Sequence, residues 1–323
     1  MRRIASFAAI AAAALHFASP AAAQDAWPVK PVRLVVPSSP GGGTDLYARL
    51  LAQAVGDALR QPFIVDNKPG ASGNIGAEVV AKAVPDGYTF LVSANPALTI
   101  NPSLYPKLPY SAERDFVAVT RGVLSPMVLC VHPAVPARSL GELIALAKRE
   151  PATIAFGSAG TGSPTYLGVR MIEEASGARF LHVPYKGLGP AYKDLLGGQI
   201  KFMLADLASA LPHIRSGRAV ALAVTERTTA LPDTPTLAEA GLPNLEVYSS
   251  FGVVGPTGTP PAIVQRMAAE IAKAMKSPQL AEKLDAQALI PVFDTPELAA
   301  ATLKKEREAW AAFIRRNGIM PSE

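Results

Sequence analysis

Residues 116–132 read FVAVTRGVLSPMVLCVH, a long run of mostly apolar and β-branched residues. A typical strand has only five or six residues, so we expect this segment to leave one β-sheet and to continue in another. A comparable return crossing is expected near Tyr248–Pro256. Two crossings predict two lobes with a cleft between them. The first lobe is discontinuous and comprises residues 24–125 and 248–323, and the second comprises residues 126–247.

Elsewhere the chain repeats a short apolar run, a turn rich in glycine or proline, and a helical pattern. This alternation predicts an α/β fold with mostly parallel sheets that helices cover on both faces. Helices are expected at Thr44–Leu59, Pro261–Lys276 and Pro296–Arg316, where apolar residues recur with helical spacing. Further strands are expected at Arg33–Val36, Phe63–Asp66, Thr89–Ser93, Thr153–Phe156, Phe180–Val183, Lys201–Leu204, Val220–Val224 and Phe251–Val254.

The N-terminus has the pattern of a cleaved secretory signal. Arg2 and Arg3 precede an apolar run over residues 7–15, and three alanines at 21–23 form a cleavage site. We therefore expect residues 1–23 to be a signal peptide that is removed on export. The apolar run is too short to span a membrane. The 323 − 23 = 300 residues that remain suit two domains better than one.

The composition narrows the possible partners. Basic and acidic residues are interspersed, and no polybasic block indicates a nucleic acid or a membrane surface. The net charge of +5 is a mild positive bias that suits a small anionic molecule. Cys130 is the only cysteine, so the chain forms no intrachain disulfide. We expect an exported monomer that is not embedded in a membrane.

A glycine-rich turn follows the first expected strand. Residues 37–45 read PSSPGGGTD and lead directly into a helix. Glycines let the backbone turn with its N–H groups exposed, and the helix N-terminus adds a partial positive charge. Gly42, Gly43, Thr44 and Asp45 are therefore candidates for holding a carboxylate or phosphate. The alternative is a structural turn in which Thr44 or Asp45 only caps the helix.

The second lobe repeats this arrangement. Residues 157–165 read GSAGTGSPT after the strand expected at Thr153–Phe156, and a helix is expected from Pro164. Ligands of open α/β sheets bind at the carboxyl ends of the strands. Two such loops that face one cleft favour binding more strongly than either loop alone. The candidates in this loop are Ser158, Ala159, Gly160 and Ser163.

Polar residues also follow other expected strands, at the cleft-facing end if the strands are parallel. Ser93 and Asn95 follow the third strand, Tyr185 follows Phe180–Val183, and Asp206 follows Lys201–Leu204. We treat these four residues as further ligand-binding candidates. The alternative for Asp206 is that it caps the helix expected from about Leu207.

Motifs for catalysis, cofactors and metals fail on inspection. Gly160-Thr161-Gly162 lacks the third glycine of a dinucleotide fingerprint, no P-loop lysine is present, and no serine stands in a G-x-S-x-G elbow. The histidines of the mature chain are dispersed, so we expect no metal site and no cofactor. A binding protein without catalysis is the leading interpretation. The alternative is an exported α/β enzyme that uses Asp206 with Lys186.

Many short blocks in order resemble the Bug family, the extracytoplasmic solute receptors of tripartite tricarboxylate transporters. The resemblance covers essentially the whole mature chain. The matching blocks are Trp27–Arg33, Pro40–Asp45, Asn67–Gly73, Pro85–Thr89, Gly157–Gly160, His182–Gly187, Leu231–Thr236 and Gly258–Pro260.

This resemblance implies the type II periplasmic-binding-protein fold, a periplasmic location and lobes that close on a ligand by a hinge motion. It also implies that the carboxylate of the ligand is held by the loops at Gly42–Asp45 and Ser158–Ser163, with delivery to the membrane components of the transporter. A receptor for a signalling system would share all these residues and stays open. Ser38–Ser39, Ser250 and Thr165–Tyr166 depart from the usual family pattern and favour a more polar pocket. The ligand itself stays open among di- and tricarboxylates, amino acids and aromatic acids.

Overall fold

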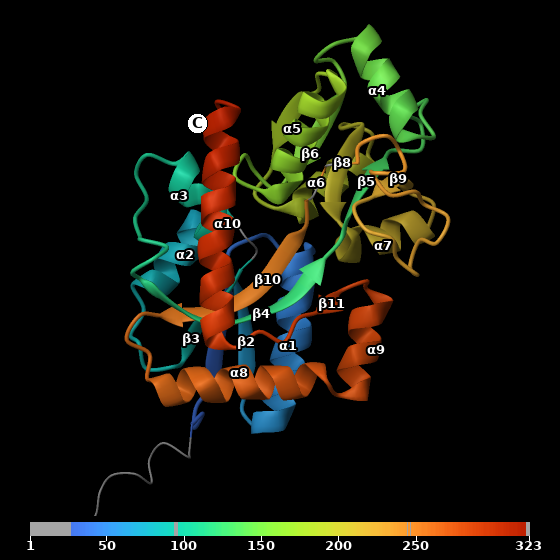
Figure 1. The fold of residues 1–323 in the computed structure, drawn as a ribbon. Helices are drawn as coiled ribbons and strands as arrows, with labels where there is room; N and C mark the ends of the chain where they lie inside the picture. The colour runs from blue at the N-terminus through green and yellow to red at the C-terminus, as the bar shows by residue number, and fades with distance from the viewer. Residues whose placement is uncertain (1–26, 94–95, 244, 246, 321–323) are drawn as a thin grey trace, which may run out of the picture.

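The computed structural model describes residues 27–93, 96–243, 245 and 247–320 (Figure 1). The expected signal peptide and Asn95 lie outside these residues. Two β-sheets organise the chain, each in its own lobe, and β4 and β10 run side by side from the first lobe toward the second (Figure 1). The fold is α/β with two lobes, as the sequence predicts.

The sheet of the first lobe has the strand order β11-β4-β10-β3-β1-β2. Strands β1 to β3 are parallel, whereas β10 runs antiparallel to both β3 and β4. Its strands are β1 (Val32–Val36), β2 (Phe63–Asn67), β3 (Thr89–Ser93), β4 (Phe116–Ser125), β10 (Ser249–Pro256) and β11 (Ile290–Pro291). The helical segments of this lobe are α1 (Gly43–Leu59), η2 (Ala71–Gly73), α2 (Asn74–Ala81), η3 (Pro96–Ile100), α3 (Asn101–Leu104), α8 (Pro261–Met275), α9 (Pro278–Ala286) and α10 (Pro296–Arg316).

The sheet of the second lobe has the order β7-β6-β8-β5-β9. Strands β6, β7 and β8 are parallel, whereas β5 runs antiparallel to β8 and β9. Its strands are β5 (Met127–Val131), β6 (Ala155–Ser158), β7 (Leu181–Pro184), β8 (Phe202–Asp206) and β9 (Val220–Val224). The helices are α4 (Leu140–Arg149), α5 (Pro164–Ser176), α6 (Leu188–Leu196) and α7 (Leu207–Arg215).

The long apolar segment crosses between the sheets as expected. It divides at Pro126, because β4 ends at Ser125 in the first sheet and β5 begins at Met127 in the second. A proline has no backbone N–H to contribute to a β-ladder, which favours the break at this position. The residue boundaries of the two lobes, 125/126 and 247/248, stay a prediction.

Both sheets are mixed, and the expectation of mostly parallel strands holds only for β1–β3 and β6–β8. The antiparallel pairs all include β4, β5 or β10, the strands that connect the lobes. A strand that leaves one lobe and a strand that returns to it run in opposite directions, so their pairing is antiparallel by geometry. The strand expected at Thr153–Phe156 lies two residues later, at Ala155–Ser158.

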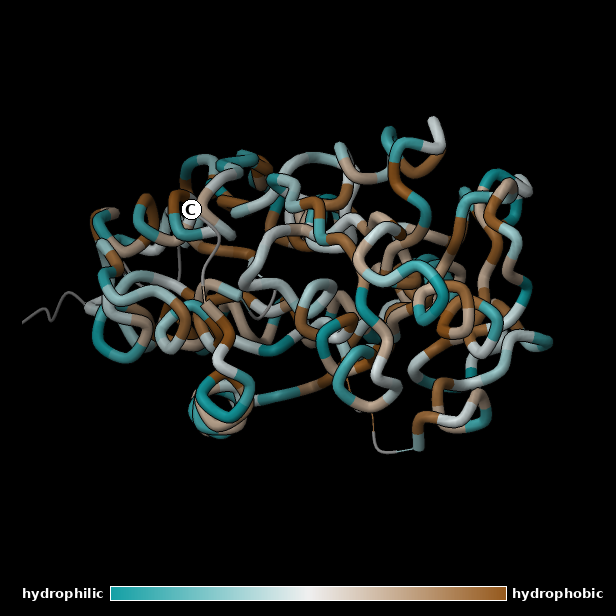
Figure 2. Tube along the Cα trace, turned by 90° about the horizontal axis from the view of Figure 1, so that it is seen from above, coloured by the Kyte–Doolittle hydropathy of each residue, from teal (hydrophilic) through white to brown (hydrophobic). Residues whose placement is uncertain are grey.

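Each lobe has its own apolar core. In the first lobe Leu34, Phe90 and Phe251 are fully buried between the sheet and its helices, and in the second lobe Phe156 and Phe202 have this role. Figure 2 shows hydrophobic stretches through the interior of the molecule and hydrophilic residues on its outer turns. Among the described residues, no helix has the length and apolar character that a membrane crossing requires.

Candidate functional site

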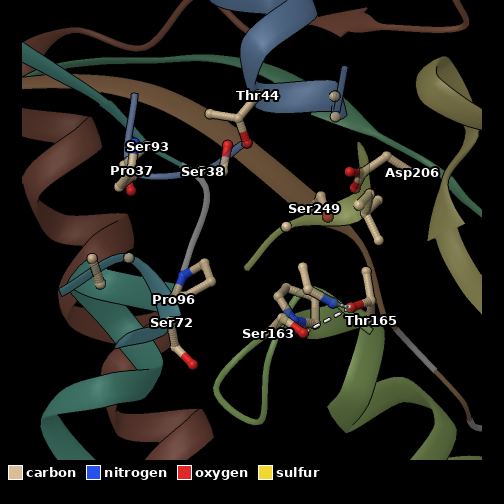
Figure 3. Close-up of a pocket in the computed structure, with 18 of the residues that line it drawn as sticks. Pro37, Ser38, Thr44, Ser72, Ser93, Pro96, Ser163, Thr165, Asp206 and Ser249 are labelled. Atoms are coloured by element: carbon tan, nitrogen blue, oxygen red, sulfur yellow. Dashed lines mark hydrogen bonds between the residues drawn. The ribbon is translucent and has the colours of Figure 1, made fainter. Parts of the chain in front are cut away.

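A cavity of about 70 Å³ lies between the two lobes (Figure 3). The first lobe contributes the ends of β1 and β3 and the starts of α1 and α2, and the second lobe contributes the starts of α5, α6 and α7. The lining consists of Pro37, Ser38, Gly42, Gly43, Thr44, Gly70, Ser72, Gly73, Ser93, Pro96, Ala97, Ala159, Ser163, Pro164, Thr165, Lys186, Gly187, Leu188, Asp206 and Ser249.

Seven of the candidates from the sequence line this cavity: Gly42, Gly43, Thr44, Ser93, Ala159, Ser163 and Asp206. They come from both lobes, so the fold brings together residues that are up to 164 positions apart (206 − 42). Four other candidates, Asp45, Ser158, Gly160 and Tyr185, are not part of the lining. Their side chains or backbones make contacts behind it.

The start of α1 is the most open anion-binding element of the cavity. Gly42 is its N-cap and offers no side chain, so the first N–H groups of this helix are not capped by a hydroxyl or carboxylate of their own loop. Gly42, Gly43 and Thr44 all line the cavity. The helix is 17 residues long and carries a partial positive charge at its N-terminus. Because its first residues line the cavity, this charge is directed at the cavity.

Asp45 does not line the cavity but stabilises this loop by hydrogen bonds. Its carboxylate accepts hydrogen bonds from the backbone N–H of Gly41 (3.1 Å) and from the side chains of Arg49 and Asn67 (3.0 Å each). Burial alone would raise the pKa of Asp45, but these donors hold the pKa below its ordinary value. Asp45 is therefore an ionised support of the glycine loop.

The three glycines of this loop have different roles. Only Gly41 has a positive φ, 89°. At Gly43 glycine is required because neighbouring side chains leave no room for a Cβ. A Cβ at this position would lie 2.8 Å from Cζ of Phe251 and 3.0 Å from Oδ2 of Asp206. A Cβ at Gly42 would have 3.8 Å to its nearest neighbour, Cβ of Leu188. The glycine loop is thus held tightly against the second lobe at one residue.

The loop at the start of α5 is closed on itself. The backbone N–H of Ala159 donates to Oγ1 of Thr165 (2.9 Å), and that of Gly160 donates to Oγ of Ser158 (3.1 Å). The hydroxyl of Ser163 donates to the carbonyl of Gly160 (2.6 Å). Because these groups already have partners, this loop presents fewer backbone donors to the cavity than the start of α1 does.

Ser158 itself is fully buried and its hydroxyl lies 2.7 Å from Nε2 of His182. The ring of His182 contacts both Phe156 and Tyr166, with ring centroids 4.9 and 4.4 Å away. Burial lowers the pKa of His182 to about 4. Sequence reasoning did not connect His182 with this loop, because 24 residues separate it from Ser158.

Tyr185 also lies behind the cavity. Its hydroxyl donates to Oδ2 of Asp194 (2.6 Å), and burial together with this carboxylate raises the pKa of Tyr185. The neighbouring residue has a different role, since Lys186 lines the cavity and its carbonyl accepts a hydrogen bond from the hydroxyl of Ser39 (2.9 Å). Ser39 belongs to the first lobe, so this bond joins the two lobes across the cleft.

Asp206 is the buried acid of the cavity. Only 6% of the residue is exposed, and Figure 3 shows its carboxyl group directed toward the side of the cavity where Thr44 and Ser249 lie. Burial raises the pKa of Asp206 to about 6, against the opposing effect of hydrogen bonds from the hydroxyl of Ser249 and the backbone N–H of Gly43. Its Oδ1 has no hydrogen-bond partner among the described residues. Asp206 occupies the N-cap position of α7 but makes no side-chain capping bond there.

A third loop of the cavity was missed as a binding element. Gly70, Ser72 and Gly73 follow β2 and precede α2, and all three line the cavity. Residues 67–73 read NKPGASG, which is again a glycine- and serine-rich turn between a strand and a helix. The rule that identified the other two loops could have identified this one. Ser249 was also missed, because it lies on the returning strand β10 instead of at the end of a parallel strand.

Two α/β lobes joined by paired strands, with a cavity between them, define the class of protein as a two-lobe binding protein of the type II periplasmic-binding-protein fold. Comparisons with known proteins agree. The model of the tripartite tricarboxylate transporter family receptor matches residues 47–319. The chain is 37% identical to the protein BugT of Bordetella pertussis over 98% of both chains.

Solved structures are similar over nearly the whole chain. Rpa4515 of R. palustris with adipate has a TM-score of 0.89 at 33% identity, covering 92% of this chain and 100% of that one. MatC of Rhodopseudomonas palustris with bound malate has a TM-score of 0.84 at 30% identity, covering 89% and 100%. The chain belongs to the tripartite tricarboxylate transporter receptor family, which also contains the Bug proteins.

Proposed function

We propose that this chain captures a small carboxylate in the cavity between its lobes and delivers it to the membrane components of a tripartite tricarboxylate transporter. The observation that carries the proposal is the start of α1, where a helix N-terminus without a side-chain cap from its own loop lines a cavity between two lobes. The backbone N–H groups at this helix start are suited to one carboxylate of the ligand, which would compete with the carboxyl of Asp206 for the N–H of Gly43.

The rest of the ligand faces hydroxyls and small residues. Ser38, Ser72, Ser93, Thr165 and Ser249 line the cavity from five different segments. Hydroxyl groups both donate and accept hydrogen bonds, so they suit a second carboxylate or a hydroxyl group of the ligand. Similar proteins with bound adipate and malate support a dicarboxylate as the ligand class.

Binding without catalysis is part of this proposal. The exported enzyme considered as an alternative would use Asp206 with Lys186, and both residues line the cavity. Such chemistry also needs a nucleophile or a bound water held near the acid or base. The hydroxyl of Ser158, which resembles a nucleophile next to His182, is fully buried and bonded within its own loop.

A thermal-shift screen of dicarboxylates, tricarboxylates, amino acids and aromatic acids tests the function. A ligand present at about 100 times its Kd stabilises the folded protein by roughly 2.7 kcal/mol. Titration calorimetry then measures Kd, and chromatography of the recovered ligand measures turnover. We expect one ligand per chain, recovered unchanged. Conversion of the ligand during the incubation would support the enzyme.

The location is proposed as the periplasm, with residues 1–23 removed. The arginines, apolar run and alanines at the N-terminus support this cleavage. Mass spectrometry of the protein recovered from the periplasm should find Gln24 as the first residue. A protein that retained Met1 there would contradict the expected cleavage.

A further inference from the structure

We propose that Asp206 binds the ligand in its protonated form, so that capture of a dicarboxylate takes up one proton. This inference rests on the proposed function, because it assigns a role to one wall of the same cavity. Asp206 comes from the second lobe and faces the start of α1 in the first. A protonated Asp206 donates a hydrogen bond to the ligand, whereas an ionised aspartate can only accept one.

The geometry creates a conflict between two anions. A ligand carboxylate at the start of α1 would lie beside Gly43, and Oδ2 of Asp206 is 3.0 Å from the point where a Cβ of Gly43 would stand. Both carboxylates would therefore share one small cavity. Two ionised carboxylates at such a distance repel each other strongly, and one proton between them converts this repulsion into a hydrogen bond.

Asp206 lacks the cation that would keep it ionised. Its Oδ1 has no partner among the described residues, and the groups that do donate to the carboxyl, Ser249 and Gly43, are neutral. The other charged side chain of the lining is Lys186, which is exposed to solvent. An ion pair of the kind that holds Asp45 ionised, with Arg49, is absent from the described surroundings of Asp206.

The neighbouring groups whose pKa is shifted are all shifted away from the range between about pH 6 and 8.5. On α1, the pKa of Asp45 is lowered and that of Tyr47 is raised. On α6, burial raises the pKa of Tyr192 well above its ordinary value, and Asp206 adds to this. On α7, burial lowers the pKa of His213, whose ring contacts Tyr192. On β5, burial raises the pKa of Cys130 to about 12. Asp206 is therefore the group of this cluster that titrates in the range.

The pH dependence follows from the pKa of about 6 in the free protein. Binding requires the protonated acid, so affinity is nearly constant below this pKa and falls as the pH rises through it. If the pKa of the complex lies well above 8, affinity for a dianion decreases about fifty-fold between pH 6 and pH 8. Close to one proton is taken up per ligand at pH 8.

Calorimetric titration with adipate and with malate tests this inference. We expect Kd to rise close to tenfold per pH unit between about pH 6.5 and 8.5, where both probes are doubly ionised. Repeating each titration in buffers of different ionisation enthalpy counts the protons taken up. Asp206→Asn carries a permanent amide donor of nearly the same shape, so its Kd should be independent of pH and lower than that of the parent at pH 8.

Asp66→Asn is the matched control. Asp66 is an ionised acid on β2 that pairs with Arg33 and Lys68 and does not line the cavity. This variant should keep the pH slope of the parent. A parent Kd that did not change with pH, or an Asp206→Asn variant with the parent's slope, would overturn the inference. Tighter binding at higher pH would also overturn it and would indicate an ionised Asp206 that pairs with a cation.

A second measurement needs no ligand. The pKa of Asp206 in the folded protein, about 6, exceeds the value of about 3.9 in an unfolded chain. The folded state therefore favours the protonated acid, and stability from this group is lost as the pH rises from about 4 to about 6. The difference between the melting temperature of Asp206→Asn and that of the parent should therefore change by several degrees in favour of the variant as the pH rises over this range.

A constant difference between the two melting temperatures would overturn the role of Asp206 as an acid of raised pKa. Failure of the chain to bind adipate, malate or any acid of the screen would instead count against the proposed function. The two failures are thus distinguishable.

Discussion

The hydroxyl of Ser158 lies 2.7 Å from Nε2 of His182 while it accepts a hydrogen bond from the backbone N–H of Gly160 (3.1 Å). The hydroxyl of Ser158 still has its proton and a second lone pair for the contact with His182, so the tautomer of the ring decides which of the two groups donates. Burial lowers the pKa of His182 to about 4, so the ring is neutral at neutral pH. A neutral His182 therefore holds the loop that forms one wall of the cavity.

Replacing this histidine should make the stability of the chain less dependent on acid. His182→Phe keeps an aromatic ring against Phe156 and Tyr166 but leaves the hydroxyl of Ser158 without its hydrogen-bond partner on the ring, which costs about 1–3 kcal/mol at neutral pH. In the parent, the folded pKa of about 4 lies below the unfolded value of about 6.5. The parent therefore loses up to about 3 kcal/mol as the pH falls from 6.5 to 4.

The stability advantage of the parent over His182→Phe should accordingly shrink or reverse toward pH 4. Urea unfolding at a series of pH values measures both proteins, and the difference between them cancels the other titrating groups. A gap that stayed constant with pH would show that His182 does not titrate as its burial predicts.

Two adjacent glycines should respond very differently to alanine. Gly43→Ala places a Cβ 2.8 Å from Phe251, which is fully buried, and 3.0 Å from Asp206 of the opposite lobe. We expect a loss of about 1–3 kcal/mol in stability and at least a tenfold weaker Kd. Gly42→Ala meets nothing closer than 3.8 Å and should change Kd by less than about threefold. Calorimetry and circular dichroism distinguish the two, and equal effects would contradict the close approach at Gly43.

Gly122 on the connecting strand β4 should be among the least replaceable glycines of the chain. Its φ is 62°, and an added Cβ would overlap the hydroxyl of Tyr47 and lie 2.9 Å from the carbonyl oxygen of Phe251. Gly177 has a similar φ of 71° but open space around it. Gly177→Ala should therefore cost only about 1 kcal/mol of backbone strain, and Gly122→Ala clearly more.

Thermal or urea unfolding of the two variants measures both losses of stability. The loss in Gly177→Ala reports the backbone strain alone, and the additional loss in Gly122→Ala reports the steric overlap with Tyr47. A Gly122→Ala protein as stable as Gly177→Ala would mean that Tyr47 moves aside without cost.

Ligand binding should bring the lobes together. The cavity has walls from both lobes, so neither lobe alone can satisfy the ligand. Small-angle scattering should give a smaller radius of gyration with ligand than without it. Ser39→Ala removes the hydroxyl that donates to the carbonyl of Lys186 across the cleft, so it should weaken Kd by about two- to tenfold and leave closure possible. An unchanged radius at saturation would contradict hinge closure.

Much of the fold was predictable because it rests on local patterns. The helix at Pro296–Arg316 has the predicted bounds, and the one expected at Thr44–Leu59 begins one residue earlier, at Gly43. The crossing within residues 116–132 was predictable from length alone, since so long an apolar segment exceeds what one sheet accommodates. The antiparallel direction of β10 was not, because pairing between strands is a relation of distant segments.

The candidate site divides in the same way. The amino-acid sequence alone determined that glycine loops would begin α1 and α5, because loop composition and helix starts are local properties. Only the tertiary structure decided which of their groups are free for a ligand. The N–H groups of Ala159 and Gly160 have partners within their own loop, whereas the start of α1 has no cap from its own loop and the N–H of Gly43 donates to Asp206 of the other lobe. Asp206 faces the other lobe and does not cap its own helix. The partner of a hydrogen-bonding group is chosen among all the segments that folding brings near it, and a local pattern contains no information about those distant segments.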